Sequence, residues 1–452
     1  MNSCAAEPAG PLVIDEYEVV IAGGTTAALA AAIASAEKGA KTALLEPTDW
    51  IGGQLTASGV PAVDEAWHSI TDKTTGKVLL DVSTLARKPK NMTPKFRDML
   101  LETGCPGGCW VSRFCFEPKP VLDEHLLPAT AAVASRLTVY PNTVVKSLTT
   151  DESTKRVTGL VAIRRFPRTG VKWQGYDRPP SADIVDWYSA EPSERFEKRT
   201  LRFDGSRAGK RFVVIEATEW GEVLALCGAR YLVGVDEFDG AVKGDDTYGQ
   251  ATVYGVVQEY SEEPKIEPVP DLGVDRLGFG PYTERDDAWE KIWTYRRLRG
   301  SGDKPQPGDL SLQNWGYSSE TNDGGNDYPF EYLFKTKAAT DEEADDWHGG
   351  VDLGVLEASE KRALAWHYWL KANTPEGIEP EQITLSIGTL GTGHGLSKLP
   401  YIRDTRRSIG LDGFVLRFAD LSGSASQRTG TKFADRIAIG AYPGGRPPDG
   451  RP

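Results

Sequence analysis

A segment near the start of the chain has the length and pattern of a strand–helix–strand unit, which limits the possible fold more than any other feature. Residues 17–22 form a short apolar run, typical of a buried parallel strand, and a glycine pair follows at 23–24. Residues 26–38 are rich in alanine and favour a helix, and Gly39 suits the position just after a helix end. Residues 41–46 are predicted to form a second strand. A unit of roughly 30 residues has the size that a dinucleotide-binding motif requires.

The loop between the predicted strand and helix matches the dinucleotide fingerprint G-x-G-x-x-G in part. Its three positions are Gly23, Thr25 and Ala28. Alanine is allowed at the third place, whereas the side chain of Thr25 widens the path of a bound diphosphate and offers it a hydroxyl donor. Glu46 stands close to the spacing at which an acidic residue binds ribose hydroxyls. A glycine turn that only packs the helix against the strand is the alternative interpretation.

A second glycine pair, Gly52 and Gly53, follows directly after the second predicted strand in the segment "IGGQLT". A fold that binds only a nicotinamide cofactor does not need another glycine turn at this place. A flavin cofactor is longer and gains from a second close approach of the backbone. The pair therefore favours FAD over a nicotinamide cofactor.

Several segments resemble one family when they are read in chain order. Residues 19–56 are similar to the N-terminal FAD segment of the two-dinucleotide-binding-domain flavoproteins and, more narrowly, of xanthan-lyase-associated FAD-dependent oxidoreductases. "VVIEATEWGEVLALCG" at 213–228 resembles the strand and glycine turn that return to the flavin in this family. "GDLSLQNWG", "GGNDYPFE" and "LPYIRDTRRSIG" resemble its later motifs, and the similarity covers about residues 15–443. The resemblance implies an α/β fold: a discontinuous Rossmann-like FAD-binding domain with an inserted β-rich α+β substrate domain.

The resemblance also divides the chain. Residues 12–150 and 205–235 are expected to build the FAD-binding domain, with a β-rich insertion at 151–204 and the substrate domain at 236–384. Residues 385–452 are expected to return to the FAD-binding domain. The family leads us to expect a last strand and a glycine-led helix there, yet the chain closes with "GGRPPDGRP", which is too rich in proline and glycine to form them. We therefore expect a C-terminal truncation.

The cofactor-binding residues implied by the resemblance lie at three turns and on one strand. They are Gly23, Gly24, Thr25, Thr26, Ala28, Glu46, Gly52, Gly53, Gln54, Thr56, Val144, Ala217, Thr218 and Gly221. The first turn is expected to hold the diphosphate, with Glu46 on the ribose. Val144 is expected to contact the adenine through its backbone. For the stretch 217–221 the alternative is a glycine turn that only starts a helix.

Four residues near the C-terminus are candidates for catalysis. His394 lies in a glycine-rich loop that brings an imidazole near the flavin as an acid or base, although a histidine facing solvent is the alternative. Arg403 or Arg407 is expected to steady an anionic reduced flavin or a substrate carboxylate, and a solvated, ion-paired face is the alternative. Tyr401 lies in the same segment and is the fourth candidate.

The function implied by the resemblance is that of an FAD-dependent oxidoreductase. It oxidises or dehydrogenates a small molecule, for which a carbohydrate-related compound is one expectation, by hydride transfer to the flavin. Two alternatives stay open. One is a flavin-fold remnant that does not bind FAD and is inactive or a binding module, and the other is a non-redox lyase or isomerase with structural FAD.

Composition excludes several partners. The formal net charge of -13 argues against a nucleic-acid-binding surface, which concentrates lysine and arginine. No apolar run is long enough to cross a bilayer and the first ten residues hold no export signal, so we expect a cytoplasmic protein without a membrane partner. Cys105, Cys109 and Cys115 lack a second Cys/His pair at ligand spacing, so no metal site is predicted.

Overall fold

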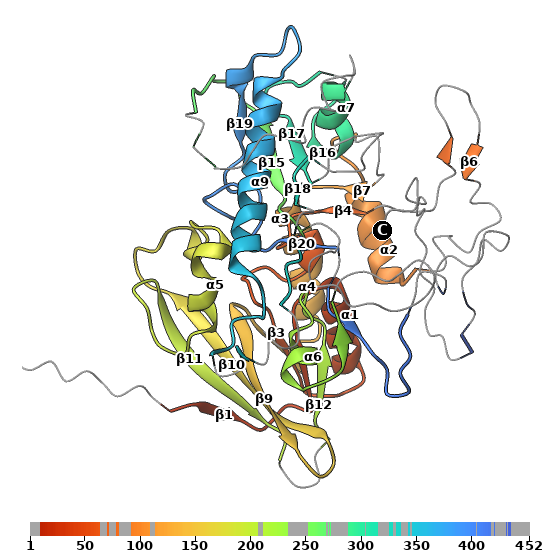
Figure 1. Ribbon diagram of the computed structural model, residues 1–452. Helices are drawn as coiled ribbons and strands as arrows, with labels where there is room; N and C mark the ends of the chain where they lie inside the picture. Colours follow the sequence, from red (N-terminus) through yellow and green to blue (C-terminus); the bar gives the residue numbers. More distant parts are fainter. Residues whose placement is uncertain are drawn as a thin grey trace, which may run out of the picture.

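The computed structural model of the chain places a parallel β-sheet at its centre (Figure 1). The residues that it describes are 10–63, 70–71, 78–80, 92–108, 114–206, 211–233, 252–267, 270, 272, 288–302, 304–314, 325–328, 331–335, 342–343, 346–403, 405–416, 420, 431 and 433–434.

The central sheet has the strand order β12-β2-β3-β8, and all its neighbouring strands are parallel. Strand β2 (Val19–Ala22) leads through helix α1 (Thr26–Glu37) to β3 (Thr42–Leu45), as the sequence predicts. Strand β8 (Leu137–Tyr140) extends the sheet beyond β3, and β12 (Val213–Glu216) returns beside β2. The discontinuous Rossmann-like domain is therefore confirmed.

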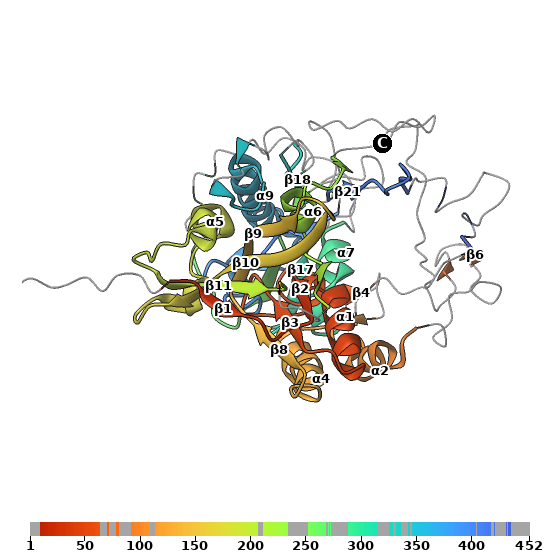
Figure 2. The same cartoon turned by 90° about the horizontal axis from the view of Figure 1, so that it is seen from below.

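Both faces of the central sheet are buried, which explains its continuous apolar strands. Successive side chains of a strand point to opposite faces. On one face Ile21 and Leu44 pack against α1, and on the other Val20 and Leu45 pack against a second sheet. Figure 2 shows these layers, with α1 and α4 on one side of β3 and the second sheet on the other.

The second sheet has the order β1-β11-β10-β9. It contains β1 (Leu12–Ile14), β9 (Thr143–Asp151), β10 (Arg156–Pro167) and β11 (Phe196–Asp204). Helix α5 (Pro180–Tyr188) lies between β10 and β11, within the segment 151–204 that is expected to be β-rich. Its proline occupies the first turn, where a missing N–H costs nothing, so it starts the helix rather than breaking it.

The upper part of the molecule in Figure 1 contains the long helix α9 (Leu353–Ala372) and a third, antiparallel sheet. That sheet has the order β16-β17-β15-β19. Two pairs of tryptophans from α7 and α9 stack there, with ring centroids 5.5 Å apart for Trp289–Trp293 and 5.0 Å for Trp366–Trp369. The bounds are β15 (Val256–Tyr260), α7 (Ala288–Tyr295), β16 (Arg297–Arg299), β17 (Leu310–Gln313) and β19 (Ile383–Leu385).

Short elements connect these layers. They are the turns Gly53–Leu55, Lys172–Gly175 and Pro380–Gln382, β4 (Ala62–Val63), β5 (Ile70–Thr71), β6 (Val78–Leu80), α2 (Pro94–Thr103), β7 (Phe114–Cys115), α3 (Pro118–Val121), the π-helical turn Leu122–Leu126, α4 (Leu127–Ala131), α6 (Glu222–Leu226), β13 (Tyr231–Leu232), β14 (Thr252–Val253), β18 (Asp327–Tyr328), β20 (Tyr401–Ile402) and β21 (Arg407–Ser408). Within the described residues, no helix is both long and apolar enough to cross a bilayer.

After β19 the described chain adds two short strands outside the central sheet. Strand β20 pairs with β14, and β21 pairs with β13. In the part of the chain that the structure describes, no strand after residue 385 joins the central sheet. Residues 435–452, on which the expectation of a truncation rests, lie outside the described residues.

The burial of the central strands gives a first prediction. Leu44 is fully buried between β2 and α1, so the variant Leu44→Ala is expected to lower the free energy of unfolding by about 2–5 kcal/mol. Leu12→Ala on β1 is the control, because Leu12 is 48% exposed and its loss is expected to cost about 0.5 kcal/mol or less. Urea unfolding followed by circular dichroism measures both. Equal losses in the two variants would contradict the layered core.

Candidate functional site

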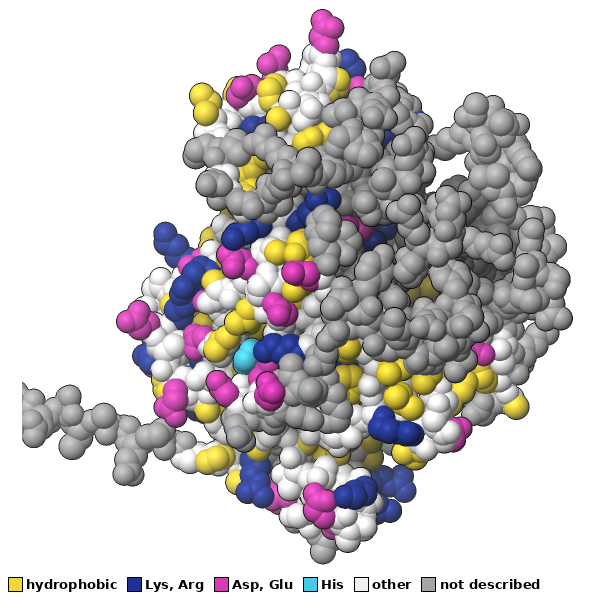
Figure 3. All heavy atoms as spheres, viewed as in Figure 1, with side chains coloured by type: hydrophobic (Ala, Val, Ile, Leu, Met, Phe, Trp, Pro, Cys, Tyr) yellow, Lys and Arg dark blue, Asp and Glu magenta, His cyan; other side chains and the backbone are white. Residues whose placement is uncertain are grey.

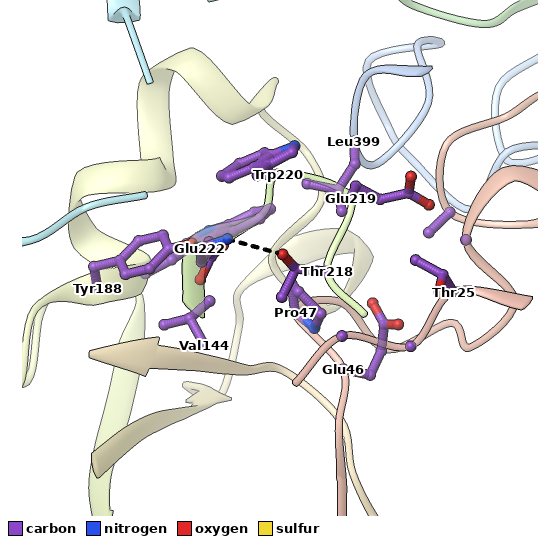
Figure 4. Close-up of a pocket in the computed structure, with 15 residues that line it drawn as sticks. Thr25, Glu46, Pro47, Val144, Tyr188, Thr218, Glu219, Trp220, Glu222 and Leu399 are labelled. Atoms are coloured by element: carbon purple, nitrogen blue, oxygen red, sulfur yellow. Dashed lines mark hydrogen bonds between the residues drawn. The ribbon is translucent and has the colours of Figure 1, made fainter. Parts of the chain in front are cut away.

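A pocket opens where strands β2, β3 and β12 end, at their carboxyl ends (Figure 4). In open parallel sheets this is the edge where ligands bind. The pocket contains about 410 Å³ of space, part of it open to solvent. Its lining residues are Gly23, Gly24, Thr25, Glu46, Pro47, Gly53, Ala57, Val144, Trp187, Tyr188, Thr218, Glu219, Trp220, Glu222 and Leu399.

The first glycine turn has no room for side chains. Gly23 has φ +95°, and a Cβ there would lie 2.2 Å from the carbonyl oxygen of Ala217. A Cβ on Gly24 would lie 1.8 Å from the Oε2 atom of Glu46. The turn after β2 thus touches the turn after β12 and the end of β3 directly. These glycines bring the three strand ends together.

Thr25 performs a structural task at this turn. Its Oγ1 atom accepts a hydrogen bond from the N–H of Ala28 at 3.1 Å, which caps α1, and donates one to the carbonyl of Ala217 at 3.0 Å. The hydroxyl is therefore committed to the protein, which corrects the expectation that it offers a donor to phosphate. Thr25 replaces the second glycine of the fingerprint by bonding the two turns to each other.

The start of α1 presents backbone N–H groups toward the pocket side of the first glycine turn. A helix leaves the N–H groups of its first turn without partners inside the helix, and its dipole makes this end positive. In the described part of the chain, no acceptor bonds the N–H groups of Thr26 and Ala27. Thr26 is exposed and Ala28 is buried. Such a helix end, beside close-packed glycines, is typical of a site for a phosphate group.

The second glycine turn lies against the first. The N–H of Gly52 donates to the carbonyl of Gly24 at 2.7 Å, and a Cβ on Gly53 would lie 2.9 Å from the Cα of Thr25. Both glycines have positive φ, +117° and +52°. The hydroxyl of Thr56 donates to the carbonyl of Ile51 at 2.7 Å, and so holds the turn rather than a ligand. Gln54 is half-buried beside it.

Glu46 ends β3 inside the pocket. Its carboxyl group is buried, and its Oε1 atom accepts hydrogen bonds from the N–H and the hydroxyl of Thr48, both at 2.7 Å. Burial raises the pKa of Glu46 to about 8, and the nearby Glu219 and Asp49 carboxylates contribute in the same direction. A fixed carboxyl group at this point is suited to bonding hydroxyl groups of a sugar.

Of the residues predicted in the turn after β12, Thr218 lines the same pocket, whereas Ala217 contacts Gly23 and Gly221 precedes α6. The Thr218 hydroxyl accepts from the N–H of Glu222 at 3.1 Å, as Figure 4 shows. Gly221 has φ +66° and begins α6. Two acidic neighbours that the sequence analysis did not single out, Glu219 and Glu222, also line the pocket. They lie within the motif "EATEWGE", and their closeness in sequence to the predicted turn could have indicated that they line the pocket.

Val144 lies in the pocket wall on β9, next to the strand end that carries Glu46. The N–H of Thr143 donates to the carbonyl of Glu46 at 2.8 Å, which ties β9 to β3. Val144 packs with Trp187 and Tyr188 of α5, and these two aromatic side chains line the pocket as well. The contact of Val144 with an adenine stays a prediction. Sequence reasoning missed the two α5 residues because the helix itself was not predicted.

None of the four catalytic candidates lies among the residues that line the pocket. The Nδ1 atom of His394 accepts from the N–H of Leu396 at 3.2 Å, and burial lowers the pKa of His394 to about 4, so the ring is neutral at pH 7. Arg403 forms an ion pair with Asp327 at 2.7 Å. Tyr401 and Arg407 lie on β20 and β21. Their catalytic roles stay predictions.

Arg406 reaches the pocket wall instead. Its Nη1 atom donates to the carbonyl of Trp220 at 2.6 Å, and its Nη2 atom donates to the carbonyl of Gly350 at 2.8 Å. Arg406 lies just before β21 and is buried, whereas Arg407 begins β21 and is half-buried.

The close approach of Gly23 to the backbone of Ala217 predicts that one added methyl group at position 23 destabilises the fold. Gly23→Ala is expected to lower the free energy of unfolding by more than about 2 kcal/mol, because the added Cβ meets the Ala217 carbonyl. Gly39→Ala is a matched control, since Gly39 has nearly the same φ, +93°, and nothing within 4 Å of an added Cβ. Both variants force alanine into a positive φ, which is unfavourable, but only Gly23→Ala adds a steric clash. Equal losses in urea unfolding would show that the strand ends do not meet as described.

The buried carboxyl group of Glu46 predicts a dependence of stability on pH. Its pKa is about 8 in the folded protein against 4.5 ordinarily, so the folded state binds more protons between these values. The contribution of Glu46 to the free energy of unfolding therefore falls as pH rises from about 4.5 to about 8. Glu46→Gln removes this contribution. The free energy of unfolding of the variant should therefore rise relative to that of the wild type between pH 5 and pH 8. The exposed Glu37→Gln is the control, and a gain of the same size there would contradict the assignment.

Comparisons with known proteins identify the family of the chain. The model of the FAD dependent oxidoreductase family matches residues 18–171 and 200–445. No curated protein matches the chain. A solved structure of a geranylgeranyl bacteriochlorophyll reductase-like protein from Thermoplasma acidophilum is 12% identical, with 57% of this chain and 49% of that chain covered and a TM-score of 0.25.

The 3-ketosteroid delta1-dehydrogenase from Sterolibacterium denitrificans is 10% identical, with 55% of this chain and 62% of that chain covered and a TM-score of 0.26. At such scores the likeness carries no argument about mechanism, and the chain spans about half the length of these structures. The family match covers most of the chain. The chain therefore belongs to the FAD dependent oxidoreductase family, and its cofactor is FAD.

Proposed function

We propose that the protein oxidises a small molecule with FAD, and that the crevice between its two glycine turns binds the FAD diphosphate. One observation carries this proposal. The N-terminus of α1, with the N–H groups of Thr26 and Ala27, lies beside Gly24 and Gly53, which carry no side chains of their own. Close backbone approach together with free N–H groups is what a diphosphate requires.

The residues of the crevice fit the adenosine half of the cofactor. Glu46 stands at the end of the strand next to β2, the place from which an acidic residue binds ribose hydroxyls in this fold. Val144 supplies an apolar wall beside it. FAD, when bound, supplies the two-electron oxidant for removing a hydride from a substrate C–H bond.

The other side of the pocket excludes water and fixes polar groups. Trp187 and Trp220 cover the crevice, and both side chains are almost fully buried. Tyr188 donates a hydrogen bond to Glu222, and burial raises the pKa of Glu222 to about 8. Arg406 lies behind this pair and holds the backbone of Trp220. These contacts keep the wall rigid, which orients whatever lies against it.

The proposed substrate is a small organic molecule. On the face seen in Figure 3, acidic and basic side chains are mixed rather than gathered in a basic stripe, and the net charge is -13. Neither feature favours nucleic acid. The expectation of a carbohydrate-related substrate rests on the family resemblance. The two stacked tryptophan pairs do not add to it, because they pack in a buried cluster.

The proposal is tested by cofactor binding and reduction. The purified protein should carry or take up FAD in one-to-one ratio, with absorption near about 450 nm, and an oxidisable substrate should bleach this band without oxygen. Glu46→Ala should weaken FAD binding roughly 10- to 100-fold through the loss of its hydrogen bonds. Glu37→Ala is the control because Glu37 is exposed and forms an ion pair with Lys95. A protein without any FAD affinity would refute the proposal, and bound flavin that no substrate bleaches would favour a structural role for it.

A further inference from the structure

The carboxyl group of Glu219 lies in the proposed diphosphate seat. Glu219 follows Thr218 in the turn after β12, and its side chain crosses to the opposite side of the crevice. A Cβ on Gly53 would lie 2.5 Å from its Oε1 atom and 2.9 Å from the Cα of Thr25, so all three groups meet at one point. Figure 4 shows the carboxyl group directed toward Thr25 and away from the wall that Trp220 and Glu222 form.

Nothing among the described residues compensates the charge of this carboxyl group. No described N–H or side chain donates a hydrogen bond to it, and no described cation pairs with it. In the described part of the chain, the N–H groups of Thr26 and Ala27 at the start of α1 donate to no group either, whereas that of Ala28 donates to Thr25. Glu219 is partly buried, and its carboxyl group lies beside Gly53 and Thr25, next to the start of α1, where an anionic ligand is expected.

The groups around Glu219 come from each element that meets there. From the end of β3, Glu46 faces it and is also acidic. Asp49 follows Glu46 in the chain by three residues and forms an ion pair with Lys398 at 3.0 Å. This lysine therefore pairs with Asp49 rather than with Glu219. From α6, Glu222 is bonded by Tyr188.

Two arginines among the described residues also contact the pocket lining. Arg406, from the segment before β21, donates to the carbonyls of Trp220 and Gly350, and Arg165 donates to the carbonyl of Pro47. Burial raises the pKa of Glu219 to about 7. Its protonation state therefore changes in the neutral range, whereas a diphosphate carries negative charge throughout that range.

We propose that Glu219 gates the cofactor seat: FAD binds when this carboxyl group is neutral and is opposed when it is ionised. The proposal rests on the proposed function, since it concerns the same seat. The neutral group is a donor to a phosphate oxygen, whereas the ionised group repels the diphosphate at close range. Binding of FAD to the ionised protein thus takes up one proton, and the affinity for FAD falls as pH rises through neutrality.

The expected size follows from the fraction of protein that is competent to bind. At pH 8 about one tenth of the molecules hold Glu219 neutral, so the apparent Kd for FAD should be about ten-fold higher than at pH 6. Glu219→Gln stays neutral and keeps the shape. It should bind FAD about ten-fold more tightly than the wild type at pH 8 and about equally at pH 6.

The experiment titrates the full-length apoprotein with FAD from pH 6 to pH 8.5 and follows the fluorescence of FAD. Calorimetry in buffers of different ionisation enthalpy counts the protons taken up. Glu219→Gln should remove the proton uptake at pH 7.5, and the exposed Glu37→Gln should keep it. Glu219→Asp keeps the charge and should keep the pH dependence, which separates charge from bulk.

Several results would overturn the gate. One such result is a wild-type affinity for FAD that does not change with pH. Another is a Glu219→Gln variant whose affinity for FAD equals that of the wild type at every pH. If Glu219→Ala binds FAD more tightly than the wild type and Glu219→Gln does not, the size of the side chain rather than its charge blocks the seat. In each of these cases FAD still binds, so the proposed function survives. Absence of FAD binding by the wild type and by all Glu219 variants at every pH would refute both proposals.

Discussion

The crevice depends on one contact between turns that are far apart in the chain. The hydroxyl of Thr25 bonds the carbonyl of Ala217 at 3.0 Å across 192 positions, while Gly23 lets the two backbones approach. Strand pairing fixes β12 beside β2, and the Thr25 bond then holds the turn after β12 against the start of α1. The position of the site therefore depends on strand pairing, on close-packed glycines and on one side-chain hydroxyl.

The strand–helix–strand unit was predictable because its signals are local. Apolar strands, an alanine-rich helix and glycine turns are each determined by neighbours in sequence, and β2, α1 and β3 lie where the pattern indicates. The return of β12 was predictable only through the family resemblance. Helix α5 was missed because proline and charged residues hide its period, although the proline only starts it. Glu219 and Arg406 act through partners that are distant in sequence, which no local pattern reveals.

The electrostatics of the crevice are unusual for an anion site. Four acidic residues, Glu46, Glu216, Glu219 and Glu222, lie at or beside it, and burial raises the pKa of each. Glu216 is satisfied by the N–H groups of Thr218 and Val223, and so holds the turn after β12. The site thus does not attract a diphosphate by positive side chains. Backbone N–H groups and the helix dipole remain as the attractive elements, and they act over short distances only.

The most direct test of this account is a crystal structure of the protein with bound FAD. The account predicts that the diphosphate lies within hydrogen-bonding distance of the N–H groups of Thr26 and Ala27, with a ribose on Glu46. It also predicts that Gly24 and Gly53 lie on either side of the diphosphate. FAD bound elsewhere in the chain, or a diphosphate whose contacts leave the start of α1 empty, would contradict it.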